Sequence, residues 1–218
     1  MKSRTSKNVL ISIISGALFL ILIVLLRTVD VAPIGPEDTT IGLSHINRAV
    51  HDATGVNMAL YSFTNVTGGI ILAAVAVFGL TGLVQWIRRK NILKVDRELL
   101  ILGGLYIIVG ILYVFFSKVA VNYRPIIMPG EGVVEASFPS SHTMLSCTVM
   151  GSTLMLLDKY VRNPTWCKIL KAVCVILLTA TVVGRLLSGA HWFTDIIGGM
   201  LLSICLLSAF AAVLDSSH

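Results

Sequence analysis

Six long apolar stretches dominate the chain, and shorter polar segments separate them. A helix needs about 20 mostly apolar residues to cross the hydrocarbon core of a bilayer. The fourth stretch is short, and we expect it to begin inside the membrane boundary beneath a re-entrant loop. The pattern predicts an all-α, six-helix transmembrane bundle. Its expected spans are Val9–Leu26, Tyr61–Val84, Leu99–Phe116, Thr143–Leu157, Ile169–Leu187 and Ile196–Leu214.

The longest segment outside the spans, Thr28–Leu60, contains a shorter periodic pattern. Leu43, Ile46, Val50 and Ala53 recur at helical spacing with polar residues between them. This pattern is typical of a short amphipathic helix that lies at the membrane interface, here in the first external loop. Such a helix either covers the bundle or guides lipid to a site. The candidates for its N-cap are Asp38, Thr39 and Thr40.

The composition agrees with a membrane protein. Of the 218 residues, 56% are hydrophobic and 13% charged, and the mean hydropathy is +0.88. A soluble domain of this size cannot hide so much apolar surface. The first stretch is too long for a signal peptide and is expected to remain as a span. Without an internal repeat or a long linker, residues 1–218 form one predicted domain.

The placement of charge predicts the orientation. With six spans, the N-terminal segment and the second and fourth loops share one side, and they carry twelve basic residues against five opposite. The positive-inside rule places this side, and both termini, in the cytoplasm of a protein of the plasma membrane. The net charge of +6 is therefore a topology signal, and no nucleic-acid partner is expected.

Polar and ionisable residues gather where the last four spans meet the external side. Each alone has an ordinary explanation, such as a basic side chain reaching the interface or a hydrogen-bonded histidine. Their convergence from four helices indicates a functional site, because ionisable groups at membrane depth are costly. The residues are Lys118, Arg124, Ser140, Ser141, His142, Arg185, His191 and Asp195.

Phosphoryl transfer suits this set of side chains. Arginine binds phosphate oxygens through paired donors, and serines before a helix add hydroxyl and backbone N–H groups at the positive end of its dipole. His191 and Asp195 are four residues apart, so the carboxylate can orient the imidazole for attack on phosphorus. The second histidine, His142, can protonate the leaving oxygen.

Three groups of these residues resemble the three signature motifs of the type 2 phosphatidic acid phosphatase superfamily, between Lys118 and Asp195. They are, in order, Arg124-Pro125, Pro139-Ser140-Ser141-His142, and Arg185 with His191 and Asp195. Three departures stand out: Ser141 replaces a glycine, Gly184 replaces a serine, and Lys118 lies six rather than seven residues before Arg124. The resemblance implies a six-span bundle in which His191 is a nucleophile that forms a phosphohistidine, oriented by Asp195, and His142 is the general acid. It implies a phosphate cradle of Arg124, Arg185, Ser140, Ser141 and Lys118, and no metal or other cofactor.

The sequence therefore predicts a metal-independent lipid phosphatase with its site at the external face. The candidate substrates are undecaprenyl pyrophosphate, phosphatidylglycerol phosphate and phosphatidic acid, and the expected partners are this lipid phosphate and the surrounding membrane lipids. A phosphotransferase that uses the same intermediate stays open as an alternative. A transporter is less favoured, because transport sites tend to lie near the midplane of the membrane.

Overall fold

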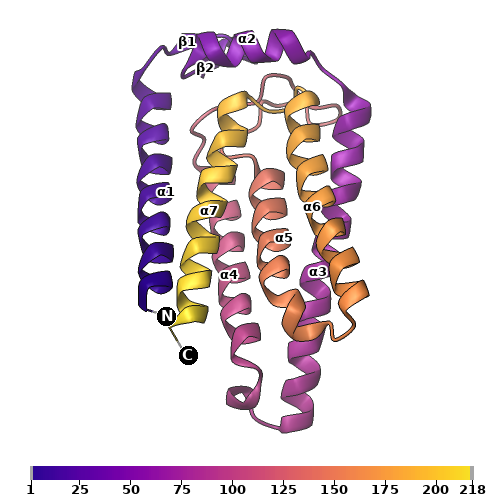
Figure 1. Ribbon diagram of the computed structural model, residues 1–218. Helices are drawn as coiled ribbons and strands as arrows, with labels where there is room; N and C mark the ends of the chain where they lie inside the picture. The colour runs from indigo at the N-terminus through magenta and orange to yellow at the C-terminus, as the bar shows by residue number, and fades with distance from the viewer. Residues whose placement is uncertain (1, 217–218) are drawn as a thin grey trace.

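The computed structural model describes residues 2–216, which are mostly helical (Figure 1). Six long helices run along a common direction, and each contains one of the six apolar stretches. Five of them, all except α5, are long and apolar enough to cross a membrane. The long helices are α1 (Lys2–Thr28), α3 (Met58–Arg89), α4 (Arg97–Lys118), α5 (Ser141–Tyr160), α6 (Pro164–Leu187) and α7 (Phe193–Asp215).

The central position of α5 explains why it is the most polar long helix. It packs against α3, α4, α6 and α7, so protein rather than lipid surrounds much of it. Its buried hydroxyls bond to carbonyls one turn earlier, as Ser152 does to Val149, or to neighbouring helices, as Thr148 does to Ser203. A helix in such surroundings does not need the continuous apolar surface of a lipid-facing span.

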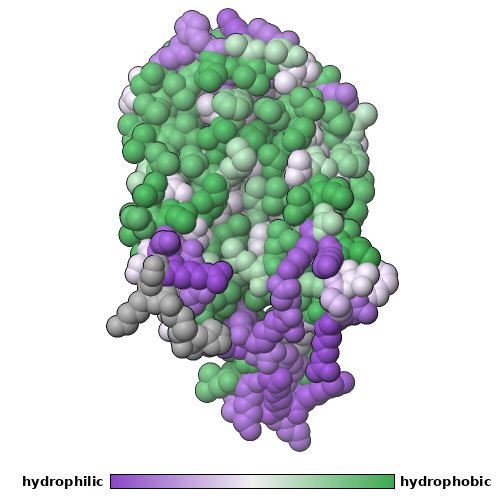
Figure 2. Space-filling view, viewed as in Figure 1, coloured by the Kyte–Doolittle hydropathy of each residue, from purple (hydrophilic) through white to green (hydrophobic). Residues whose placement is uncertain are grey.

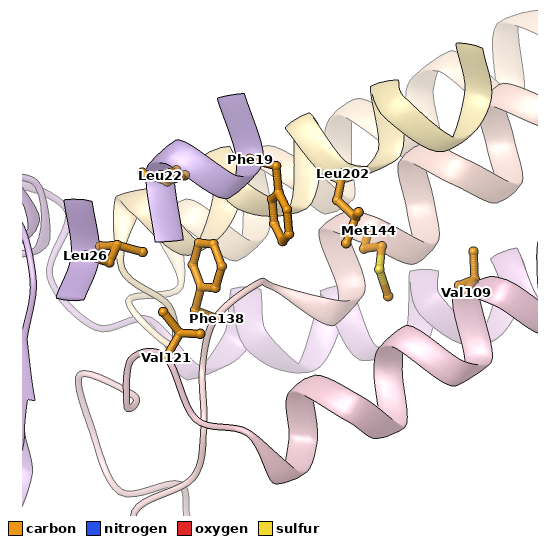
Figure 3. Close-up of a cluster of buried hydrophobic side chains, with 8 residues drawn as sticks. All are labelled: Phe19, Leu22, Leu26, Val109, Val121, Phe138, Met144 and Leu202. Carbon is orange, nitrogen blue, oxygen red and sulfur yellow. The ribbon is translucent and has the colours of Figure 1, made fainter. Parts of the chain in front are cut away.

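The peripheral helix α1 packs along α7 and takes part in a buried apolar cluster near the α2 end of the bundle (Figure 3). In this cluster the ring of Phe138 stacks on Phe19 with centroids 5.7 Å apart. Phe138 directly precedes the Pro139-Ser140 motif, so the cluster fixes the start of that motif against the bundle. Its members are Phe19, Leu22, Leu26, Val109, Val121, Phe138, Met144 and Leu202.

The segment between α1 and α3 crosses one end of the bundle (Figure 1). It contains the two-residue antiparallel strands β1 (Ala32–Pro33) and β2 (Thr40–Ile41), with the short 3-10 helix η1 (Pro36–Asp38) between them. The helix α2 (Ser44–Thr54) follows, and a second 3-10 helix, η2 (Ile92–Lys94), joins α3 to α4 at the other end.

The structure corrects one expectation for α2, the position of its N-cap. Its N-terminus is capped by Asp30, whose carboxylate accepts from the His45 N–H and the Ser44 hydroxyl, both at 2.8 Å, and not by residues 38–40. The backbone bond from His45 is the main reason why the pKa of Asp30 lies below its usual value. The residues of α2 that are buried are Ser44 and Asn47, whereas Ile46 is 47% exposed.

The surface separates into polar ends and an apolar body. Hydrophilic residues gather at the two ends of the molecule, and hydrophobic residues cover the region between them (Figure 2). The helix α1 begins and α7 ends at the end opposite α2, where the α3–α4 and α5–α6 turns also lie (Figure 1). This arrangement is that of a multi-pass membrane protein.

Candidate active site

The loop between α4 and α5 brings Arg124 to the α2 end of the bundle. Tyr123 and Ala136 form an isolated antiparallel bridge, and the Arg124 N–H donates to the Glu135 carbonyl at 3.0 Å. The guanidinium forms an ion pair with Glu135 at 2.8 Å through Nε and donates to the Ala190 carbonyl at 3.1 Å through Nη1. Arg124 is thereby fixed beside His191.

His191 lies in the short connection between α6 and α7, between Arg124 and Asp195. Its Nδ1 is 3.4 Å from Asp195 Oδ2, and its Nε2 is 3.4 Å from Arg124 Nη1. The carboxylate therefore favours the proton on Nδ1, which leaves Nε2 unprotonated, with its lone pair toward Arg124. Burial is the main cause that holds the pKa of His191 well below its usual value, and the charges of Arg124 and Arg185 add to it.

Asp195 belongs to the first turn of α7 and is fully buried. Its Oδ2 accepts the Trp192 N–H at 2.9 Å, and its backbone carbonyl accepts the Ser140 N–H at 3.0 Å. The second bond joins the third motif to the second. The position of the Asp195 carboxylate relative to His191 is thus set by α7, which carries it, and by the bond to Ser140.

Arg185, near the end of α6, is a fully buried cation. Its guanidinium lies 4.6 Å from the centroid of the Tyr61 ring and donates through Nη2 to Asn65 Oδ1. Within residues 2–216, no carboxylate pairs with it and its Nε has no hydrogen-bond partner. A buried charge left without an opposite charge is costly, and an anionic ligand would compensate it.

The two serines before His142 have different surroundings. Ser140 is fully buried and is the N-cap of α5: its Oγ accepts from Thr143 N at 3.4 Å and Thr143 Oγ1 at 3.1 Å. Ser141 begins α5 and lines a cavity of about 400 Å³ together with Arg124 and His191. The Ser141 side chain therefore reaches the cavity, whereas Ser140 supports the helix.

Lys118 lines the same cavity. It is the last residue of α4, so the chain from Lys118 to Arg124 is not helical and the six-residue spacing does not separate them on helix faces. The side chain has no hydrogen bond or ion pair among the residues that the structure describes. Lys118 is thus an exposed cation at the wall of the cavity.

A second cavity of about 560 Å³ lies between α3, α4 and α5 and is mainly apolar. His142 and Asn65 line it at the end near the site, and Leu72, Val75 and Val149 line it farther along the helices. Tyr113, Ser141 and Met144 line both cavities. The polar cavity and the apolar cavity therefore adjoin, and the two histidines line one each.

Arg124 lies beside His191, and Arg185 bonds to Asn65, which lines the apolar cavity with His142. The fold therefore brings the predicted cations and histidines to the same end of the bundle, although Arg185 itself lines neither cavity. The sequence analysis missed the residues that hold them: Glu135 for Arg124, and Tyr61 with Asn65 for Arg185. An asparagine inside an apolar span was a usable signal for Asn65. Within residues 2–216, no three His, Cys, Asp or Glu side chains are grouped as a metal site would require.

The bundle and its site define a multi-pass membrane protein with a cationic, histidine-containing cavity at one end. The sequence profile of the PAP2 superfamily matches residues 98–217, which is more than half of the chain. The chain therefore belongs to the PAP2 superfamily and is a membrane phosphatase.

The fold is also similar to that of a solved structure. This is the crystal structure of the first transmembrane PAP2-type phosphatidylglycerolphosphate phosphatase from Bacillus subtilis. The TM-score is 0.60, and the match covers 94% of this chain and 95% of the other at 18% sequence identity. At this identity the likeness concerns the fold alone. A search of the curated proteins found no match.

Proposed function

We propose that the chain is a metal-independent lipid phosphatase that hydrolyses a phosphomonoester or diphosphate head group through a phosphohistidine at His191. The observation that carries this proposal is the junction of the two cavities. A phosphate fits beside Arg124 and His191 in the polar cavity, and a hydrocarbon tail fits the apolar cavity. A soluble phosphate ester would have no use for the second cavity.

The side chains supply each step of the reaction. Arg124, Arg185, Lys118 and Ser141 neutralise and orient the phosphate, while Ser140 keeps the start of α5 in place. The Nε2 lone pair of His191 attacks phosphorus as the bond to the lipid oxygen breaks, and His142 gives its proton to that oxygen.

The intermediate is then hydrolysed. Water attacks the phosphohistidine, His142 takes a proton from the water, and inorganic phosphate leaves. Asp195 stabilises the positive charge of His191 during both steps. The 3.4 Å distance between His191 and Asp195 is long for a hydrogen bond, and such catalytic contacts commonly tighten when the substrate binds.

We place the protein in the plasma membrane as a single domain with all six long helices across the bilayer and α2 at its outer interface. Five helices meet the length and hydropathy expected of spans, and α5 is shielded by the other helices. Both termini then lie in the cytoplasm, because the basic loops share their side. The site faces the exterior.

The test is phosphate release by the purified chain in detergent from phosphatidic acid, phosphatidylglycerol phosphate and undecaprenyl pyrophosphate. Glycerol phosphate serves as the substrate without a tail. We expect turnover of at least one lipid, full activity in EDTA, and an acid-labile ³²P label that His191→Ala abolishes. His45→Ala, an exposed histidine at the same end, is the matched control. Loss of turnover in EDTA with recovery on adding Zn²⁺ or Mg²⁺ would overturn the metal-independent mechanism.

A further inference from the structure

The side of α2 that faces the bundle is polar, although an apolar side was available. Ser44 and Asn47 are buried, His51 on the same face is half-buried, and Ile46 is exposed. Ser44 is already explained, because it bonds to the capping Asp30. Asn47, which is 0% exposed, requires another explanation, because burying an amide is costly unless its polar atoms are bonded.

The Asn47 amide is fully bonded, and two of its three contacts go to Thr194 in the first turn of α7. Its Oδ1 accepts the Thr194 N–H at 3.1 Å, and its Nδ2 donates to Thr194 Oγ1 at 3.0 Å and to the Gly42 carbonyl at 2.9 Å. First-turn N–H groups have no partner within their own helix. Trp192, the N-cap residue, has no side-chain acceptor, so Asn47 caps α7 from 147 residues away.

Thr194 directly precedes Asp195, so the position of the first turn determines where the carboxylate lies relative to His191. The chain of bonds also extends to the loop that carries Arg124. Gly42, which accepts from Asn47, donates its N–H to Asn122 Oδ1 at 3.3 Å. Asn47 itself lines neither cavity.

We propose that Asn47 is a positioning residue, which holds the first turn of α7 so that Asp195 orients His191. This inference rests on the proposed phosphohistidine mechanism. The helix α2 then supports the geometry of the active site through Asn47 and does not only cover the end of the bundle. Asn47 acts on the rate of the chemical step, and it does not act on the binding of the lipid.

The test compares Asn47→Ala, Thr194→Val and Thr194→Ser in the full chain, with phosphatidic acid or whichever lipid phosphate the unmodified chain turns over. We expect Asn47→Ala to lower kcat on the order of tenfold to a hundredfold, because small displacements of catalytic groups are costly, while KM stays unchanged. Thr194→Val should lower kcat less, and Thr194→Ser should retain it. The double variant Asn47→Ala/Thr194→Val should be no slower than Asn47→Ala, because both changes remove the same contact.

Hydrogen exchange followed by mass spectrometry reports on the contact without substrate. Peptides that contain Thr194 should exchange faster in Asn47→Ala than in the unmodified chain. The matched control is Asn163→Ala, which removes an asparagine N-cap of α6 at the opposite end of the bundle and should change neither kcat nor exchange at Thr194.

Three results would overturn the proposal: unchanged exchange at Thr194 in Asn47→Ala, a rise in KM with kcat unchanged, or a double variant whose losses multiply. If Asn47→Ala does not fold, Thr194→Val against Thr194→Ser decides the question by the same kcat comparison. If the unmodified chain releases no phosphate from any lipid, the proposed function fails, whereas the exchange data still show whether Asn47 holds α7.

Discussion

The two histidines of the site have different surroundings, and the different roles that we propose for them rest on this difference. His191 has the Asp195 carboxylate 3.4 Å from Nδ1 and Arg124 beside Nε2. His142 lies in the first turn of α5 and lines the apolar cavity, where the leaving lipid oxygen is expected. A nucleophile needs a free lone pair on a neutral ring, and a general acid needs to reach the leaving group.

We therefore expect His191→Ala and His142→Ala each to lower the turnover of a lipid phosphate on the order of 100-fold or more. With an aryl phosphate, whose leaving group needs little protonation, His142→Ala should regain much of its rate and His191→Ala should stay inactive. Steady-state kinetics with both substrates provide the measurement. If the aryl substrate rescued His191→Ala instead, the two roles would have to be exchanged.

At the scale of the elements, the loop before α5 is held by a close contact between Phe138 and α7. A Cβ added at Gly198 would meet the Phe138 ring, and that ring cannot move away because it is 1% exposed and packed between Phe19 and Phe116. Only a glycine allows α7 to approach this loop so closely. The Pro139-Ser140 backbone, and with it the start of α5, depends on this contact.

Gly198→Ala should therefore destabilise the protein by about 1–3 kcal/mol through overpacking, although alanine is the better helix former, and should also lower kcat. Thermal unfolding in detergent and turnover provide the measurements. Combining it with Phe138→Leu should restore part of both losses by removing the clash. The control is Gly104→Ala in α4, where an added Cβ meets nothing within 4 Å. Equal effects of the two glycine changes would contradict this explanation.

At the scale of the whole molecule, the two ends of the bundle differ in charge and in content. The α2 segment, the α4–α5 loop and the α6–α7 connection lie at one end, and the chain ends and the remaining turns lie at the other (Figure 1). The proposed orientation puts the first end outside the cell. A cysteine introduced at Glu131 or at Lys90, both exposed, marks one end or the other of the bundle.

In intact cells, a membrane-impermeant maleimide should label Glu131→Cys and leave Lys90→Cys unlabelled until the membrane is opened. The unmodified chain, with its four native cysteines, gives the background. The opposite pattern would place the site at the cytoplasmic face and contradict a substrate in the outer leaflet.

The positions of the helices and the identity of the candidate site residues followed from the sequence alone. Apolar runs specify helices locally, because a backbone in lipid must satisfy its own hydrogen bonds. Arg185, His191 and Asp195 were visible because ionisable groups are rare beside apolar spans. The resemblance to the PAP2 superfamily, now established by the family match, rested on the same local motifs.

Only the tertiary structure decided which groups hold these residues. The partners of Arg185 lie on α3, about 120 residues away in sequence, and Asn47 reaches Thr194 across 147 residues. The side of α2 that faces the bundle also could not be inferred from its apolar spacing, because the end of the bundle against which α2 packs is partly polar. Hydrophobic periodicity indicates which side of a helix is kept from water. Hydrogen bonds between distant elements depend instead on how the helices pack, which no local pattern specifies.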